Sequence, residues 1–78
     1  LENATGGINI TNNTNDSYIS LSTDNGSGGV SQYILLDGNT VTTQLLTQKV
    51  MIPNLPTSDP ANAGQLYNDS GTLKISAG

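Results

Sequence analysis

The sequence predicts an all-β fold, a meander of short strands followed by a C-terminal β-hairpin. Apolar and polar residues alternate with a period of two in several short segments, as they do in strands with two different faces. Glycine, asparagine and aspartate cluster between these segments, where turns require them. Asparagine, threonine and serine together supply 28 of the 78 residues. These residue types favour turns and solvated strand faces over helices.

Period-two alternation predicts four short strands in the first half of the chain. They cover residues 8–10, 18–23, 30–36 and 40–45. Turns are predicted between them at 12–17, 24–29 and 37–39, each rich in glycine, asparagine or aspartate.

A fifth strand is predicted at residues 49–52, and Pro53 ends it because proline has no N–H to donate to a ladder. The stretch from 43 to 51 is ambiguous, since its apolar residues could also line a short helix. Its threonine-rich flank and the lack of a clear cap favour a strand or a bent corner. The first structural region is therefore a meander over residues 1–53.

Residues 54–64 are predicted to be a connector punctuated by proline and glycine. Asp59-Pro60 could cap a single helical turn that Gly64 ends. The hairpin follows at residues 65–78, where the turn-forming Asn-Asp-Ser-Gly lies between two alternating segments. We expect the meander, the connector and the hairpin to form one structural unit.

The chain has little material for a core of its own. A chain of this size buries only about 60% of its unfolded surface, and hydrophobic residues make up 33% of it. It has neither cysteine nor histidine, so no disulfide or thiolate–imidazole metal site can stabilise it. Leu35-Leu36 and Leu45-Leu46 place a leucine on both faces of their strands. We therefore predict a homotrimer, with chains intertwined or side by side in a fibre-like assembly, rather than a dimer.

The apolar positions of the alternating segments are the predicted core. An isolated two-stranded ribbon is marginal in water, so the terminal hairpin needs a surface to dock on. Its predicted anchors are Leu66, Tyr67, Leu73 and Ile75. The other core positions are Ile8, Ile10, Ile19, Leu21, Val30, Ile34, Leu36, Val41, Leu45, Val50 and Ile52.

The charges argue against several classes of partner. The net charge is −4 and Lys plus Arg number only two, so the electrostatic term of nucleic-acid binding is missing. No apolar run reaches the roughly 20 residues that span a bilayer, so we expect no membrane insertion.

The acidic residues other than Glu2 lie at predicted turns, where aspartate usually binds its own backbone. We predict no enzymatic activity, no cofactor and no metal site.

One turn is a candidate contact loop. Its glycine-rich sequence superficially resembles a calcium loop, but the spaced carboxylates and the terminal Glu of such a loop are missing. We interpret it as a flexible, exposed hairpin tip. The loop consists of Asp24, Asn25, Gly26, Ser27, Gly28 and Gly29.

Two segments resemble proteins of tailed bacteriophages. Residues 55–78 read Leu-Pro-Thr-Ser-Asp-Pro-Ala-Asn-Ala-Gly-Gln-Leu-Tyr-Asn-Asp-Ser-Gly-Thr-Leu-Lys-Ile-Ser-Ala-Gly, which resembles the C-terminal endings of many virion proteins. Residues 15–38 resemble, less specifically, a recurrent β unit in tail-fibre-like proteins of marine phages. Tyr67 stands where tryptophan is frequent, and Ile34-Leu35 where an aromatic residue is common. Both departures weaken the case for recognition through aromatic side chains.

The resemblance implies a homotrimeric, β-rich virion component. Such modules hold three chains in register or form the distal end that touches the host. We therefore expect a structural module at the C-terminus of a phage tail fibre. The alternatives are a receptor-binding tip that contacts host polysaccharide or a surface protein, and a capsid decoration or head-fibre protein.

Overall fold

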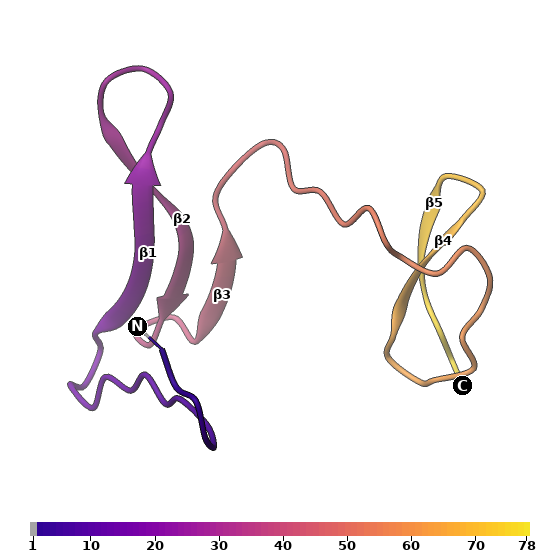
Figure 1. Ribbon diagram of the computed structural model, residues 1–78, viewed down its shortest axis with the longest axis horizontal. Coiled ribbons are helices and arrows are strands. Elements are labelled where there is room, and N and C mark those ends of the chain that lie inside the picture. The colour runs from indigo at the N-terminus through magenta and orange to yellow at the C-terminus, as the bar shows by residue number, and fades with distance from the viewer. Residues whose placement is uncertain (1) are drawn as a thin grey trace.

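The computed structural model describes residues 2–78, and the regular structure in this range is all β-strand (Figure 1). Two separate antiparallel sheets are present, one of three strands and one of two. The first is a meander in the order β1-β2-β3, and the second is a hairpin of β4 and β5. The strands are β1 (Tyr18–Asp24), β2 (Val30–Asp37), β3 (Thr42–Leu45), β4 (Leu66–Asp69) and β5 (Thr72–Ile75). The predicted all-β fold, with its meander and its C-terminal hairpin, is confirmed.

A β-bulge interrupts the pairing of β1 with β2. Leu21 pairs with Ile34 and Ser22 with Gln32, which leaves Tyr33 without a partner residue on β1. A bulge of this kind bends the strand and re-aims the extra side chain. The Tyr33 hydroxyl donates to the backbone carbonyl of Asp24 at 2.6 Å. The bulge therefore ties the middle of the sheet to the start of the β1–β2 loop.

The register gives the meander one apolar face. Ile19 is opposite Leu36, and Leu21 is opposite Ile34. Ile34 is in turn opposite Leu45 on β3. Since successive strand residues point to opposite faces, these five side chains share one side of the sheet. We call Ile19, Leu21, Ile34, Leu36 and Leu45 the apolar sheet face.

The β4–β5 turn has the backbone that its sequence predicts. Two residues connect the strands, and both have positive φ, 50° at Ser70 and 94° at Gly71. Positive φ at both central residues is the mark of a type I′ turn, whose twist matches that of paired strands. The Asn68 side chain accepts a hydrogen bond from Gly71 N at 2.7 Å. The turn is therefore specified by local chemistry alone.

A Gly71→Ala variant is expected to destabilise the hairpin by about 1–2 kcal/mol, the cost of a left-handed backbone for an L-residue. No atom lies within 4 Å of an added Cβ at this position, so the cost is one of backbone conformation alone. Hydrogen exchange of the β4 and β5 amides measures it. Gly7→Ala is the matched control, because Gly7 lacks both a positive φ and a neighbour within 4 Å. Equal effects of the two substitutions would contradict this explanation.

The predicted strand at residues 8–10 is wrong. This segment is irregular, and no strand in the described part of the chain pairs with it. Asparagine side chains hold the region instead. The Asn12 amide nitrogen donates to Tyr18 O at 2.8 Å and to Ser17 Oγ at 3.3 Å.

The predicted strand at residues 49–52 and the predicted helical turn before Gly64 are also wrong. The chain leaves the sheet after Leu46, whose N–H donates to Tyr33 O at 2.9 Å, and no strand within residues 2–78 pairs with the segment that follows. Ala61 has a φ of 54°, which a right-handed helical turn does not accept. Gly64 has the positive φ, 90°, of a glycine that ends a helical turn, but residues 59–63 form no such turn before it.

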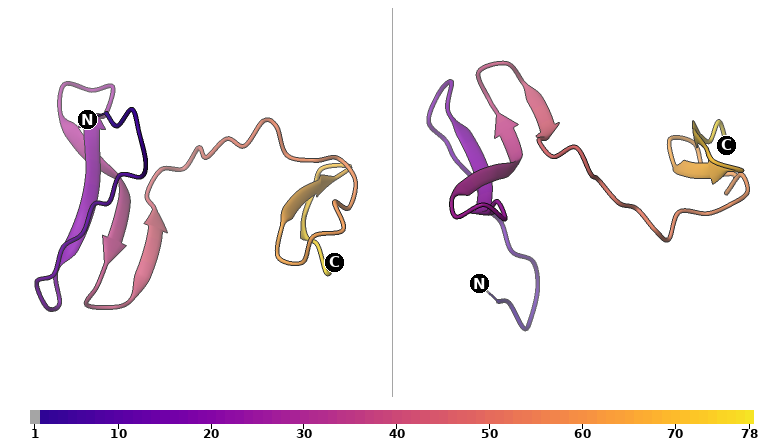
Figure 2. Two further views of the ribbon diagram at one scale, coloured as in Figure 1. Left: turned by 60° about the horizontal axis from the view of Figure 1, so that its bottom comes forward. Right: turned by 90° about the horizontal axis from the view of Figure 1, so that it is seen from above.

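No hydrophobic residue of the described chain is buried, so the predicted core does not form within one copy. The chain exposes 6465 Å², about 2,000 Å² more than a folded monomer of 8.0 kDa is expected to expose. Its radius of gyration is 16.6 Å, against about 11.5 Å for a compact domain of 78 residues. The two sheets lie apart in every view, and no strand of one contacts a strand of the other (Figures 1 and 2).

Candidate self-association surface

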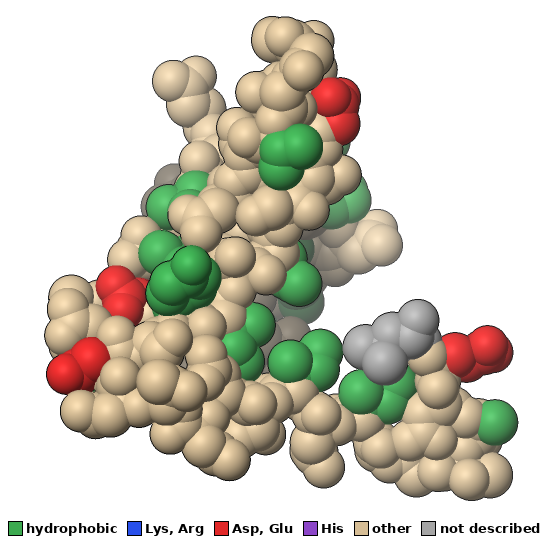
Figure 3. All heavy atoms as spheres, turned by 90° about the vertical axis from the view of Figure 1, so that its left-hand side faces the viewer, with side chains coloured by type: hydrophobic (Ala, Val, Ile, Leu, Met, Phe, Trp, Pro, Cys, Tyr) green, Lys and Arg blue, Asp and Glu red, His purple; other side chains and the backbone are tan. Residues whose placement is uncertain are grey.

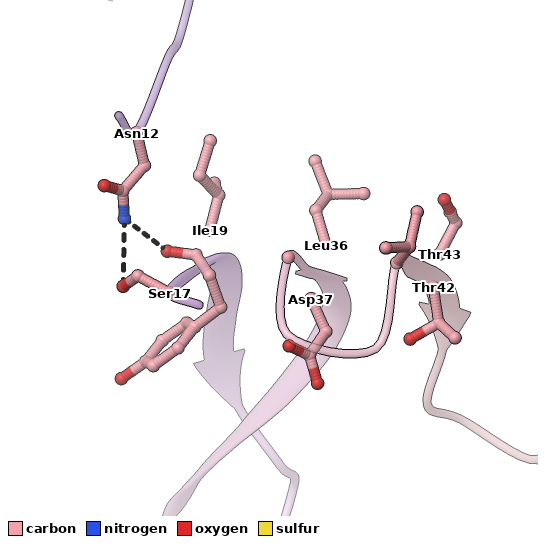
Figure 4. A pocket seen from close by; sticks show the side chains of 10 residues that line it. Asn12, Ser17, Ile19, Leu36, Asp37, Thr42 and Thr43 are labelled. Atoms are coloured by element: carbon pink, nitrogen blue, oxygen red, sulfur yellow. Dashed lines mark hydrogen bonds between the residues drawn. The ribbon is translucent and has the colours of Figure 1, made fainter. Parts of the chain in front are cut away.

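The apolar sheet face is hollowed. Ile10, from the segment before β1, lies beside it and completes a concavity of about 120 Å³. An apolar cavity of about 150 Å³ accommodates benzene, so this one matches a single aliphatic side chain. The alternation is visible in Figure 4, where Ile19 and Leu36 point to one side of the sheet and Asp37 to the other. The concavity is lined by Ile10, Ile19, Leu21, Ile34 and Leu36.

The hairpin has an apolar face of its own. Leu66 is opposite Ile75, and Leu73 lies two residues from Ile75 on the same strand, so the three side chains share one side. Leu73 is 63% exposed and Ile75 is 67% exposed, while Leu66 is half-buried. We call these three residues the hairpin apolar face. Three of the four predicted anchors thus lie together, and their role as anchors remains a prediction.

The fourth predicted anchor, Tyr67, lies on the opposite side of the hairpin. It is half-buried and pairs with Lys74 across the strands. Lys74 forms an ion pair with Asp69, and the hydrogen bond and charge of that carboxylate raise the pKa of the lysine. Both charged side chains are about half exposed, and exposed ion pairs contribute little to stability. This side of the hairpin is polar.

Hydrophobic side chains reach the surface elsewhere on the meander as well. Figure 3 shows them dispersed among polar atoms and acidic side chains on one side of the molecule. Val30 and Val41 are 72% and 89% exposed. Single exposed apolar residues are ordinary on proteins, whereas two organised apolar faces on one small chain are not.

The predicted contact loop is exposed but internally bonded. Asp24 Oδ2 accepts from Gly26 N at 3.0 Å. Asn25 Oδ1 accepts from Ser27 N at 2.8 Å and from Gly29 N at 3.2 Å. Side-chain oxygens that could meet a ligand therefore already stabilise the turn. The exposed residues are Asp24, Asn25, Gly26, Ser27, Gly28 and Gly29, and their role in contacts remains a prediction.

The prediction that turn aspartates bind their own backbone is confirmed at three sites. Besides Asp24, Asp37 accepts from Asn39 N at 2.9 Å. Asp59 accepts from Ala61 N at 2.9 Å. Each bond joins the carboxylate to the amide two residues on, which is the geometry of an Asx turn.

A second hollow, of about 280 Å³, lies at the end of the meander where β1 starts and β2 ends (Figure 4). Its polar groups are largely used within the chain. Asn12 binds Ser17 and Tyr18, as the dashed lines in the figure show, and its oxygen accepts from Thr14 N at 3.0 Å. The Thr42 hydroxyl is bonded to two neighbouring side chains. This hollow offers a ligand few free polar partners.

Ser76 is the buried residue of the described chain, with 3% of its surface exposed. Its backbone N–H donates to Gln65 O at 2.8 Å, and its carbonyl accepts from Gly64 N at 2.9 Å. Its hydroxyl donates to Asp59 Oδ1 at 2.6 Å and accepts from Asn62 N at 3.2 Å. One serine thus joins the end of the hairpin to the connector.

A further bond, from Asn68 N to Pro56 O at 2.8 Å, attaches the start of the connector to β4. Residues 56–78 therefore form one hydrogen-bonded body, which we call the C-terminal clasp. Sequence reasoning missed Ser76. Its side-chain partners in the connector lie 14 and 17 residues away, so no local pattern distinguishes it from the other serines.

Comparison of the chain with protein families, with curated proteins and with solved structures finds no match. Within residues 2–78, no three His, Cys, Asp or Glu side chains lie close enough together to hold a metal ion. The same residues form no helix long and apolar enough to cross a membrane. The described chain does offer two exposed apolar faces, and these are the candidate site.

The clasp is expected to loosen in acid. Hydrogen bonds from the Ser76 hydroxyl and then from the Ala61 amide hold the pKa of the Asp59 carboxyl below its usual value. Because the pKa of Asp59 is lower in the folded chain than in the unfolded chain, ionised Asp59 stabilises the fold. This stabilisation is complete above the pKa of an unfolded aspartate, near 3.9, and is lost as the pH falls through the lower pKa of the folded state. The Asn62 amide should therefore lose protection from hydrogen exchange below about pH 4. Asp59→Asn should abolish this pH dependence, and its persistence in that variant would assign it to another group.

Proposed function

We propose that this chain is a structural module at the C-terminal end of a phage tail fibre, in which three copies associate through apolar faces that one copy leaves exposed. The observation that carries the proposal is that the described chain buries no hydrophobic residue. Its excess exposed area of about 2,000 Å² is comparable with what stable oligomers bury at one interface. Exposed apolar area is unfavourable by about 25 cal/mol per Å², so association has a strong driving force.

The assignment to a phage fibre rests on two resemblances. Residues 55–78 resemble the C-terminal endings of tailed-phage virion proteins, and residues 15–38 resemble a β unit of tail-fibre-like proteins. A closed ring of three copies also covers sheet edges, which otherwise invite open-ended aggregation. On this proposal the module acts by holding chains in register within the virion, without catalysis, nucleic acid or membrane insertion.

A second candidate function is host contact at the β1–β2 tip. The observation in its favour is that the Asn25 side chain accepts two hydrogen bonds from amides of this exposed loop. Such bonds restrict the loop and so lower the entropic cost of binding a surface polysaccharide or protein. A chain with this loop replaced by a Gly-Ser linker should lose adsorption to host cells while keeping its oligomeric state. Unchanged adsorption would remove this candidate.

The mass of the chain in solution tests the trimer. Sedimentation velocity and native mass spectrometry should give about 24 kDa, three times the 8.0 kDa of one chain. A folded species of 8.0 kDa that persists at high concentration would contradict the proposal.

A further inference from the structure

We infer that the hairpin apolar face of each copy docks on the apolar sheet face of the next copy around the ring. This inference rests on the proposed trimer and adds which surface meets which. The occupant of the hollowed sheet face is thus a second copy of this chain, namely the side of its β4–β5 hairpin that bears Leu66, Leu73 and Ile75.

The two faces match in shape and spacing. Leu73 and Ile75 lie two residues apart on one strand, about 6.8 Å. The pairs Ile19–Leu36 and Leu21–Ile34 are also two residues apart along their strands, so the rows on the sheet repeat at the same distance. The concavity between these rows has the volume of about one aliphatic side chain. A projecting leucine or isoleucine of the hairpin fits it.

The connector keeps the two faces of one chain apart. Leu46 makes the last bond to the sheet, and the clasp begins at Pro56. Both views in Figure 2 show the chain running outward between these points, so that the hairpin lies away from the meander. A turn closed by Leu55 N on Ile52 O at 3.4 Å, with Pro53 at its second position, directs the chain into the clasp, which lies away from the meander. The face available to the hairpin is therefore one on a neighbour.

In a closed ring, docking of unlike faces leaves no face uncovered. Each copy supplies one hairpin face and one sheet face, so three copies in a head-to-tail ring cover all six. Packing of like faces is less favourable for the sheet, because one hollow surface cannot fill another.

Disulfide capture between two tagged chains tests the inference, and the natural chain contributes no cysteine to the background. Leu73→Cys carries one tag and Leu21→Cys the other, and the two are co-expressed and oxidised. We expect a two-chain species bearing both tags, at a yield several-fold above that of the control. The control pairs Leu21→Cys with Thr72→Cys, whose side chain lies on the polar side of the hairpin. Ile75→Cys with Ile19→Cys is a second pair, should the first variants fold poorly.

The outcomes separate this inference from the trimer itself. A 24 kDa particle in which Leu73→Cys links only to another Leu73→Cys overturns the inference and leaves the trimer intact. A Leu21→Cys/Leu73→Cys double variant that closes within one chain overturns it by showing that the faces meet in the same copy. A wild-type mass of 8.0 kDa overturns the proposed trimer as well.

Discussion

Leu21→Asp is expected to convert the proposed trimer into monomers. In a single chain Leu21 is 56% exposed, so a carboxylate there keeps its water and leaves the pairing of β1 with β2 intact. In the trimer the same carboxylate would be buried against aliphatic side chains, three times over. The effective penalty for an unpaired buried charge is several kcal/mol per ion. Sedimentation velocity should show the mass falling from about 24 kDa to 8.0 kDa.

Ser22→Asp is the matched control for this experiment. It adds the same charge one residue further along β1, on the opposite side of the sheet and at an exposed position. This variant should remain trimeric with an unchanged circular dichroism spectrum. A trimeric Leu21→Asp protein, or equal dissociation of both variants, would show that the apolar sheet face is not the interface.

Ser76→Ala is expected to release the connector from the hairpin. The hydroxyl accepts from Asn62 N and Gly78 N, both at 3.2 Å, and donates to Asp59. Each of the two backbone bonds contributes about 1 kcal/mol, so their loss should speed exchange of the Asn62 amide up to about 30-fold. Hydrogen-exchange mass spectrometry of the clasp measures this change.

Ser58→Ala is the control for the clasp, because Ser58 is exposed and adjacent to Asp59 but takes no part in the bonds around Ser76. Its exchange pattern should equal that of the wild type. Unchanged protection of Asn62 in Ser76→Ala would mean that the backbone bonds of residue 76 hold the clasp without its hydroxyl.

The two β-hairpins were predictable from the sequence because their causes are local. Alternating residues on β1 and β2 surround a glycine-rich turn, and Ser70-Gly71 has the left-handed backbone that a two-residue turn requires. Residues 49–52 have an equally good strand pattern, yet they form no strand. A strand needs a partner backbone, and the pattern of one segment does not say whether a partner is present.

The candidate site was predictable only in part. Alternation assigned Leu21 and Leu36 to one face, and Leu73 and Ile75 to another, as the register shows. Leucines on both strand faces indicated that some apolar surface would need a partner chain. They did not show that the hairpin and the meander would leave each other uncovered within one chain, because that depends on the path of the connector. The bulge at Tyr33 was not predicted either, since an unpaired residue is defined only once two strands are in register.

If the proposed trimer supplies the core that one copy does not bury, its stability depends on the concentration of chains. If the apolar faces are covered only in the trimer, the balance between assembled and free chains follows the third power of concentration, and each tenfold dilution removes about 2.8 kcal/mol of driving force per trimer. The melting temperature of the isolated chain should rise as it is concentrated. In the proposed fibre, neighbouring chains would have an effective concentration in the millimolar range, independent of their concentration in solution. On this proposal, the apolar faces of such a segment become covered only where two further copies already lie alongside it.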